Sequence, residues 1–282
     1  KTVNTDITAI ILTKNESVNI VRCIESLSGL AQRIVVVDSG SEDHTVELAA
    51  QLGAEIYRHP FRHYADQFNW ALDHTDIQTT WVYRSDADEA VPEDLRQEIL
   101  TECQAHREDD VNGFLMKHKL YFLGRYLTHG GAYPFVKMTV FKPAYGRFED
   151  RAMGEHVVLR SGRRILLRHD CLHYDCKNLT AFLEKHNAYA DREVVDYFSA
   201  QTEQGNVYRQ AARSRQLRDR LYYRLPKFFR AKVYYWYRYY GKLGFLDGTP
   251  GKIYALLQGY CYRVMVDAKI YEAEVQRRAG KP

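Results

Sequence analysis

Two aspartates, Asp86 and Asp88, directly follow the apolar segment Trp81–Arg84, which has the pattern of a buried strand. Carboxylates two positions apart can turn toward one site where the backbone bends after a strand. Oxygen ligands suit hard divalent cations, and Mg²⁺ or Mn²⁺ commonly joins one or two carboxylates to substrate phosphates. We therefore expect Asp88, with Asp86 nearby, to hold Mn²⁺ or Mg²⁺. The alternative is a solvated acidic turn before a helix that opens at Pro92.

Polar residues also follow two other apolar segments. Asp38 ends the segment Arg33–Val37, and its carboxylate could accept hydrogen bonds from a ribose hydroxyl or a base N–H, or form an Asx turn with Gly40, or do both. Thr13-Lys14-Asn15-Glu16 follows Ile7–Leu12 and could hold a base edge and a pyrophosphate, or be an ordinary loop. The chain contains neither the dinucleotide-binding glycine motif nor a P-loop, so neither of those nucleotide sites is supported.

The elements that must position these residues alternate between strand and helix through residues 1–100. Strand patterns occur at Ile7–Leu12, Arg33–Val37, Ala54–Arg58 and Trp81–Arg84. Helix patterns occur around Ile20–Leu27, up to Leu52 with Ser41 or Asp43 as the cap, from Asp66 to about His74, and after Pro92. This alternation predicts a doubly wound α/β domain with a mostly parallel sheet. Ligands bind beyond the carboxyl ends of such strands, where the polar residues above are expected to lie.

The rest of the chain changes in character. Residues 111–170 are richer in strand and turn patterns, for example at Gly113–Tyr121 and Val136–Phe141, and residues 176–220 have a helical pattern. We expect a catalytic domain over residues 1–200, with halves at 1–100 and 101–200, and a helical extension over residues 201–282.

Composition supports a globular protein with an uneven charge. The 282 residues are 45% hydrophobic and 27% charged, and no apolar run approaches the roughly 20 residues that span a bilayer. The five cysteines form no CxxC pair, which favours a reducing compartment over a disulfide framework or zinc site. The net charge is +4, yet residues 201–282 carry 17 Lys and Arg against 6 Asp and Glu, so we expect the C-terminal part to face an anionic partner.

Three runs of the first half together resemble the nucleotide-sugar half of family 2 glycosyltransferases with the GT-A fold. They are TAIILTKNESVNIVRCIESL, RIVVVDSGSEDHT and WVYRSDADEAVPEDL, and their spacing matches as well. The resemblance implies that Asp86 and Asp88 are the Asp-x-Asp metal motif, and that the nucleoside is held by Thr13, Asn15, Glu16 and Asp38. Gln67 and Asn69, in ADQFNWAL, match a short helical motif that lines the donor site, or are polar positions on a surface helix.

The second half resembles the acceptor half of bacterial lipopolysaccharide-core and exopolysaccharide sugar transferases of this family. The similar blocks are GRYLTHGGAYP, RAMGEHVVL, LEKHNAYADRE and the tail from YRYYGKLGFLDGTPG onward. Two positions depart from the family pattern. Gly154 replaces a frequent Asp, which weakens any base role shared by two acids. Thr139-Val140-Phe141 replaces Arg-Leu-Phe, which removes a cation that could steady the donor phosphate or the acceptor.

An inverting transfer needs a general base, because the acceptor hydroxyl must lose a proton as it attacks the anomeric carbon. Glu155 is our candidate, and the alternative is a surface Glu at a strand edge. His156 could orient Glu155 or bind the acceptor. His173 could be a third metal ligand or a structural histidine. Lys185 could neutralise the leaving diphosphate, or be a solvated lysine on a helix.

From Tyr208 to Lys242 basic and aromatic residues alternate. The basic ones we single out are Arg224, Lys227, Arg230, Lys232 and Arg238. This mixture suits an anionic membrane surface, where Tyr and Trp occupy the headgroup region. Single-stranded nucleic acid is a weaker alternative, because no RNA-binding motif is present. Packing between helices or a homo-oligomer is the third interpretation.

These observations predict an inverting, metal-dependent glycosyltransferase. It would move a sugar from a nucleotide-sugar, a UDP-sugar by preference, to a lipid-linked or cell-surface glycan. We expect it in the cytoplasm, peripheral on the inner face of the cytoplasmic membrane. The alternatives are a polyprenyl-phosphate sugar synthase, whose phosphate acceptor needs no deprotonation, and a non-catalytic protein that binds membrane or nucleic acid surfaces.

Overall fold

The computed structural model describes residues 5–149, 156–174, 177–202 and 222–280. The chain forms two compact units. The first comprises Lys1–Tyr121 and Tyr133–Lys177, and the second comprises Phe122–Ala132 and Asn178–Pro282. Packing thus assigns the region after Lys177 to the second unit, whereas the predicted functional division at residue 200 stays a prediction.

The first unit is built on a mixed sheet with the strand order β3-β2-β1-β4-β8-β6-β11-β5. Four neighbouring strands are parallel: β1 (Ile7–Thr13), β2 (Arg33–Asp38), β3 (Glu55–Arg58) and β4 (Trp81–Asp86). Beyond β4, the antiparallel β8 (Phe135–Phe141) is followed by β6 (Val111–Phe122), which pairs in parallel with β11 (Arg163–His173). The short β5 (Glu89–Ala90) closes this end, and β9 (Gly146–Phe148) and β10 (Val157–Leu159) form a separate ribbon.

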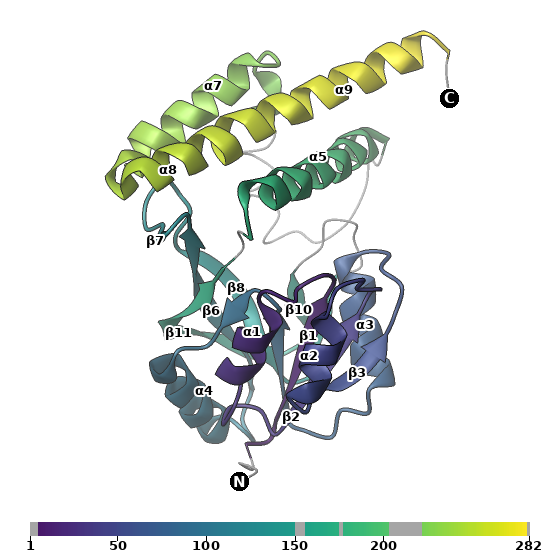
Figure 1. Ribbon diagram of the computed structural model, residues 1–282, viewed down its shortest axis with the longest axis vertical. Helices are drawn as coiled ribbons and strands as arrows, with labels where there is room; N and C mark the ends of the chain where they lie inside the picture. Colours follow the sequence, from purple (N-terminus) through teal and green to yellow (C-terminus); the bar gives the residue numbers. More distant parts are fainter. Residues whose placement is uncertain (1–4, 150–155, 175–176, 203–221, 281–282) are drawn as a thin grey trace. The chain divides into compact units, whose positions relative to one another are not determined.

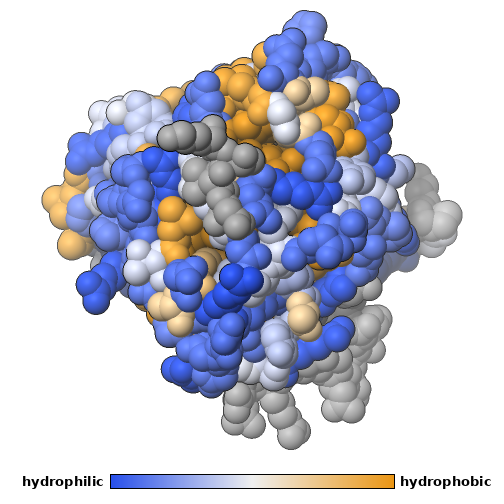
Figure 2. Space-filling model, turned by 90° about the horizontal axis from the view of Figure 1, so that it is seen from below, coloured by the Kyte–Doolittle hydropathy of each residue, from blue (hydrophilic) through white to orange (hydrophobic). Residues whose placement is uncertain are grey.

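Helices cover both faces of the parallel strands (Figure 1). They are α1 (Ile20–Ser26), α2 (Thr45–Gln51), α3 (Tyr64–His74) and α4 (Glu93–Ala105). Side chains alternate between the two faces of a strand, so Ile7, Ala9 and Ile11 of β1 join the core with α1 and α4, while Ile10 joins the core with α3. Burial on both faces explains why β1 is a continuous apolar run. The surface drawn in Figure 2 is mostly hydrophilic, with hydrophobic atoms in separate areas.

The predicted α/β class with a mainly parallel sheet is confirmed, as are the predicted strands of the first half. The predicted cap of α2 is wrong for Ser41, whose hydroxyl donates to Asp38. The N-cap residue is His44, which makes no side-chain cap bond, and the predicted Asp43 accepts the Thr45 N–H of the first turn at 3.1 Å. Pro92 lies at the N-cap of α4, one position before its first turn.

The second unit is helical, and its C-terminal helices confirm the predicted helical region. It contains α5 (Leu179–Thr202), α7 (Phe229–Trp236), η1 (Tyr237–Gly241), η2 (Gly244–Asp247), α8 (Gly248–Tyr254), η3 (Ala255–Cys261) and α9 (Tyr262–Arg278), with β7 (Arg125–Tyr126) from the inserted segment. Ala190 of α5 packs with Val266 and Ile270 of α9. Residues 176 and 203–220 of the predicted helical stretch lie outside the described residues. Among the described helices, none has the length and apolar character that a membrane crossing requires.

Two of the arginines predicted to face a membrane lie inside the second unit. Arg230 is 2% exposed and donates from Nε to Asp267 Oδ1 at 2.7 Å. Arg238 is 5% exposed and donates from Nε to the Gly130 carbonyl at 2.6 Å. For these two residues the prediction of lipid contact is wrong, because buried cations of this kind serve internal pairing.

Candidate functional site

The predicted polar residues gather at the carboxyl edge of the parallel strands. Thr13 at the end of β1 is in register with Asp38 at the end of β2, and Leu12 is in register with Asp86 at the end of β4. The register of three neighbouring strands therefore places Thr13, Asp38 and Asp86 along one edge of the sheet.

The Asp38 carboxylate stabilises the turn that follows β2. Oδ2 accepts the N–H groups of Gly40 and Ser41 at 2.9 and 3.0 Å, and Oδ1 accepts the Ser41 hydroxyl at 2.5 Å. The Asx turn weighed from the sequence is therefore present, and a contact from Asp38 to a nucleoside stays a prediction. Thr13 is buried, and its hydroxyl has no hydrogen-bond partner among the described residues, so it is an orphaned polar atom at this edge.

The loop after β1 is tied to the loop after β2. The Asn15 N–H donates to Ser41 Oγ at 2.9 Å, and Asn15 Oδ1 accepts the Glu42 N–H at 2.8 Å. Lys177, which the sequence did not single out, pairs with Glu16 Oε1 at 2.8 Å and also donates to the Asn15 carbonyl. Burial raises the pKa of Glu16 despite this cation. Hydrogen bonds thus hold together the two loops that carry residues predicted to bind the nucleoside.

Gln67 and Asn69 of α3 bond to backbone groups rather than to solvent. Gln67 is 1% exposed and donates to the His59 carbonyl at 3.1 Å, while its buried Oε1 has no partner among the described residues. Asn69 makes two bonds to the backbone of Phe148, at 3.0 and 3.1 Å. The surface-position alternative is therefore wrong for Gln67, and the donor-lining role of both stays a prediction.

Three donors hold the Asp86 carboxylate. The Tyr64 hydroxyl donates to Oδ1 at 2.7 Å, Lys137 Nζ donates to Oδ2 at 3.0 Å, and Arg84 donates to both oxygens at 3.2 and 3.3 Å. Burial favours the neutral acid, but the charges of Arg84 and Lys137 outweigh it and hold the pKa of Asp86 well below its usual range. Asp86 is therefore ionised and fixed in place.

A buried network of charged and polar side chains supports the position of Asp86. Lys137 of β8 pairs with Glu89 Oε1 at 2.5 Å, Glu89 Oε2 accepts the Asp86 N–H at 3.3 Å, and His118 Nδ1 lies 3.1 Å from Glu89 Oε1. Burial lowers the pKa of His118 to about 4, so the imidazole is neutral near pH 7. Sequence reasoning missed all three residues, although a lysine and a histidine inside predicted apolar strands were a signal.

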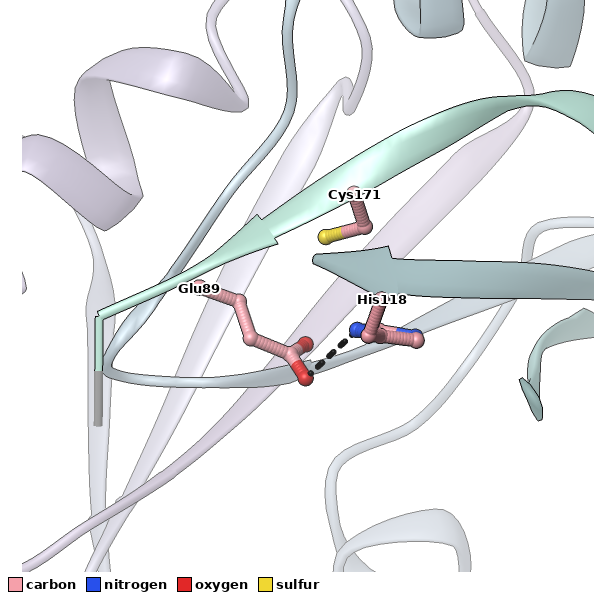
Figure 3. A group of neighbouring side chains, drawn as sticks. All are labelled: Glu89, His118 and Cys171. Atoms are coloured by element: carbon pink, nitrogen blue, oxygen red, sulfur yellow. Dashed lines mark ion pairs between the residues drawn. The ribbon is translucent and has the colours of Figure 1, made fainter. Parts of the chain in front are cut away.

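Glu89, His118 and Cys171 lie close enough to suggest a metal site of their own (Figure 3). Their nearest ligand atoms lie within 4.8 Å of one another, and all three residues are buried. However, the Lys137 ammonium already occupies Glu89 Oε1, and burial raises the pKa of the Cys171 thiol well above its usual value. A divalent cation there would face an ammonium and a protonated thiol, so we interpret the trio as polar core.

Replacing Lys137 by Met should lower the free energy of unfolding by about 3–5 kcal/mol, because Glu89 would keep a buried charge without its cation. Chemical denaturation measures this. Lys14→Met, at an exposed lysine, is the matched control. Adding Glu89→Gln to Lys137→Met should restore part of the loss, and equal stability of Lys137→Met and the control would contradict the role given to this pair.

Asp88 and His173 are brought together, as a shared metal site would require. The end of β11 pairs with β5, which places His173 opposite Glu89, and His173 Nε2 lies 3.3 Å from Asp88 Oδ2. A carboxylate and an imidazole suit Mn²⁺, and Asp86 lies two residues away with its oxygens held by cationic donors. These residues fit a divalent cation bound directly by Asp88 and His173, with Asp86 as a positioned neighbour.

The other predicted site residues are not brought to this edge by described contacts. Glu155 lies outside the described residues. His156 is exposed, and its carbonyl accepts the Glu149 N–H at 3.2 Å. Lys185 lies on α5 of the second unit, with Nζ 5.9 Å from the centre of the Tyr189 ring. The roles of these three residues stay predictions.

Comparison with known proteins identifies the family. Residues 8–174 match the family model described as glycosyl transferase family 2. The chain belongs to glycosyltransferase family 2. Apart from the segment 122–132, the residues matched to family 2 lie within the first unit, which carries the Asp86-Ala87-Asp88 turn.

Two relatives illustrate the similarity within family 2. An uncharacterized glycosyltransferase of Rickettsia conorii is 28% identical over 205 residues, which are 70% of this chain and 72% of that protein. The lipopolysaccharide core biosynthesis glycosyltransferase LpsC of Rhizobium meliloti is 26% identical over 279 residues, which are 94% of this chain and 92% of LpsC. The second similarity extends through both units.

Solved structures give weaker similarity. Glucosyl-3-phosphoglycerate synthase from Mycobacterium tuberculosis, in complex with Mn²⁺, UDP and glucosyl-3-phosphoglycerate, matches with a TM-score of 0.33 and 22% identity over 41% of this chain and 44% of that one. The same synthase with Mg²⁺ and UDP matches with a TM-score of 0.42 and 16% identity over 62% and 73%. This family 2 chain thus spans less than half of the first of these structures.

Proposed function

We propose that this family 2 glycosyltransferase is inverting and metal-dependent, and that it transfers a sugar from a UDP-sugar to a lipid-linked or cell-surface glycan. The observation that carries the proposal is the pairing of Asp88 with His173 beside the fixed Asp86 carboxylate, at the edge where β1, β2 and β4 end. Carboxylates and an imidazole at that edge suit a cation that binds a diphosphate.

The residues of this chain would have the following roles in the proposed reaction. Asp88 and His173 would hold the cation, which neutralises charge on the leaving diphosphate when bound. Lys137, Arg84 and Tyr64 keep Asp86 in place. Glu155, the proposed base, would take the acceptor's hydroxyl proton while the hydroxyl oxygen bonds to the anomeric carbon. The bond to the diphosphate oxygen breaks on the opposite face, so the configuration inverts.

Nucleotide binding tests the donor half of the proposal. A ligand that binds only the native state raises the melting temperature by mass action. We expect UDP and UDP-sugars, in the presence of Mn²⁺, to raise it more than other nucleotides, and we expect slow hydrolysis of the matching UDP-sugar. Absence of both effects across a panel of nucleotides and nucleotide-sugars would overturn the proposal.

The acceptor proposal rests on similarity rather than on the site. The similarity to LpsC covers 94% of this chain, and that protein's name places it in lipopolysaccharide core biosynthesis. A lipopolysaccharide-core glycan is therefore the acceptor class we propose. Such an acceptor is carried on lipid, which leads to the question of a membrane surface.

We propose that the second unit attaches the protein peripherally to the cytoplasmic face of the membrane, mainly through exposed apolar side chains. Phe229, Val233, Trp236 and Tyr240 recur at helical spacing and are 54%, 42%, 61% and 49% exposed. Side chains that lie on one face of a helix in this way suit the boundary between headgroups and acyl chains. Arg224 and Lys232 are exposed and would add attraction to anionic lipid.

Replacing Phe229 and Trp236 together by Ser should weaken binding to vesicles containing phosphatidylglycerol by about tenfold or more, because two rings lose apolar burial. Co-sedimentation at low and high salt measures this. Tyr271→Ser with Val275→Ser is the matched control, at residues of α9 that are 56% and 45% exposed. If the unaltered protein ignores such vesicles at low salt, these side chains serve packing or an oligomer instead.

A further inference from the structure

The second unit holds a histidine and an aspartate in a dyad that the proposed reaction does not yet use. His129 lies in the segment Phe122–Ala132, which leads directly into β8, and Asp247 ends η2. His129 Nδ1 lies 2.9 Å from Asp247 Oδ1, and the two side chains are 36% and 1% exposed. A buried carboxylate therefore supports a partly exposed imidazole.

The Asp247 carboxylate makes its hydrogen bonds to the segment Phe122–Ala132. It stands at the N-cap of α8, where an aspartate would ordinarily bond to the first turn, yet it makes no side-chain cap bond. Its oxygens instead accept the N–H groups of Thr128 and His129 at 3.0 and 2.8 Å, the Thr128 hydroxyl at 3.1 Å, and His129 Nδ1. Burial favours the neutral acid, but these donors outweigh it and lower the pKa of Asp247, so the carboxylate is ionised near pH 7.

The backbone after His129 is also fixed. Gly130 and Gly131 have φ values of +62° and +71°, which residues other than glycine rarely adopt. The Gly130 N–H donates to the Lys242 carbonyl at 2.8 Å, its carbonyl accepts Arg238 Nε at 2.6 Å, and a Cβ on Gly130 would lie 3.3 Å from the Gly244 Cα. The position of His129 is therefore set by contacts on both sides of it.

Three of the four bonds to Asp247 hold the segment rather than the ring, because they come from Thr128 and from the His129 backbone. The fourth bond, from Nδ1, orients only the ring. Because Nδ1 is bonded to the carboxylate, Nε2 is the ring nitrogen left to bond elsewhere. A ring nitrogen held in one orientation on a partly exposed side chain suits the hydroxyl group of a sugar, which can donate or accept.

We propose that His129, oriented by Asp247, is a binding residue for the sugar acceptor, and that its Nε2 forms a hydrogen bond with an acceptor hydroxyl. This inference rests on the proposed glycosyltransferase function.

The test is His129→Asn, because the Asn amide can still donate to Asp247 but has no atom in place of Nε2. The probe acceptor is the membrane fraction of cells that lack the gene for this chain, with a radiolabelled UDP-sugar as donor. We expect kcat/KM for this acceptor to fall about tenfold or more, as for a lost ligand hydrogen bond. Donor hydrolysis and the melting temperature should stay near those of the unaltered protein.

Thr128→Val is the matched control, because it removes the contacts of the Thr128 hydroxyl with Asp247 and with His129 Nδ1 but keeps the imidazole and its bond to Asp247. An equal fall in acceptor turnover for both variants would overturn the proposal in favour of a structural clamp. Unchanged transfer by His129→Asn would overturn it as well, with the glycosyltransferase function intact. If the unaltered protein neither transfers sugar to these membranes nor hydrolyses a donor, the proposed function fails and this inference fails with it.

Discussion

Replacing Asp88 by Ala should abolish sugar transfer and donor hydrolysis together, with a fall of at least about 10³-fold in turnover. Asp88 is 8% exposed and lies beside His173, and in the proposed mechanism its carboxylate would hold a cation that neutralises charge on the donor diphosphate. Without that carboxylate, charge on the leaving diphosphate would be left uncompensated. Steady-state assays with a UDP-sugar and Mn²⁺ measure the effect.

The fold should survive this substitution, because the charge network of Lys137 and Glu89 does not depend on the Asp88 carboxylate. Circular dichroism and the melting temperature check that point. Glu108→Ala, at an exposed carboxylate of the same unit, is the matched control and should keep full activity. Full activity of the unaltered protein in excess chelator, or of Asp88→Ala in Mn²⁺, would contradict the metal-dependent mechanism.

Replacing Glu155 by Gln should lower kcat by about 10²–10⁴-fold, because the amide keeps the shape of the side chain and loses its basicity. Donor affinity should change little, since the residues predicted to hold the nucleoside lie at the edge of β1, β2 and β4. Transfer kinetics give kcat, and a UDP titration in Mn²⁺ gives the affinity.

Glu149→Gln is the matched control, since Glu149 is a second glutamate only six positions away in the chain. It should stay within a few-fold of the unaltered protein. A Glu155→Gln variant that also stays within a few-fold would exclude Glu155 as the base. NMR of the product should show an anomeric configuration opposite to that of the donor, and retention would contradict the inverting mechanism.

The sequence pattern alone was enough to predict the strands and helices that carry the proposed donor site. A strand buried on both faces needs an apolar residue at nearly every position, so Ile7–Leu12 and Arg33–Val37 identified β1 and β2 directly. Because neighbouring parallel strands have their carboxyl ends at one edge of the sheet, the sequence also predicts that the residues after them lie at that edge. The proximity of Thr13, Asp38 and Asp86 follows from the same reasoning.

The partners of these residues were decided by tertiary structure. Lys137 reaches Asp86 from 51 positions away, and Lys177 reaches Glu16 from 161 positions away, because the order and register of the strands bring their ends together. Neither contact has a periodic signature, since each depends on which strands become neighbours. The strand pattern at Val136–Phe141 contains Lys137 among apolar residues, and the place of β8 between β4 and β6 explains that charge.

The C-terminal region shows the same division between pattern and packing. Its sequence determined that basic and aromatic residues alternate on helices, and this composition suits an anionic surface. Which of those residues reach a surface depends on how the helices pack, and Arg230 turned inward to Asp267 while Trp236 stayed 61% exposed. The pairing of His129 with Asp247, 118 positions apart, was likewise set by tertiary contacts alone. Composition constrains the partners a chain can have, but only the folded backbone decides which charges are already paired within it.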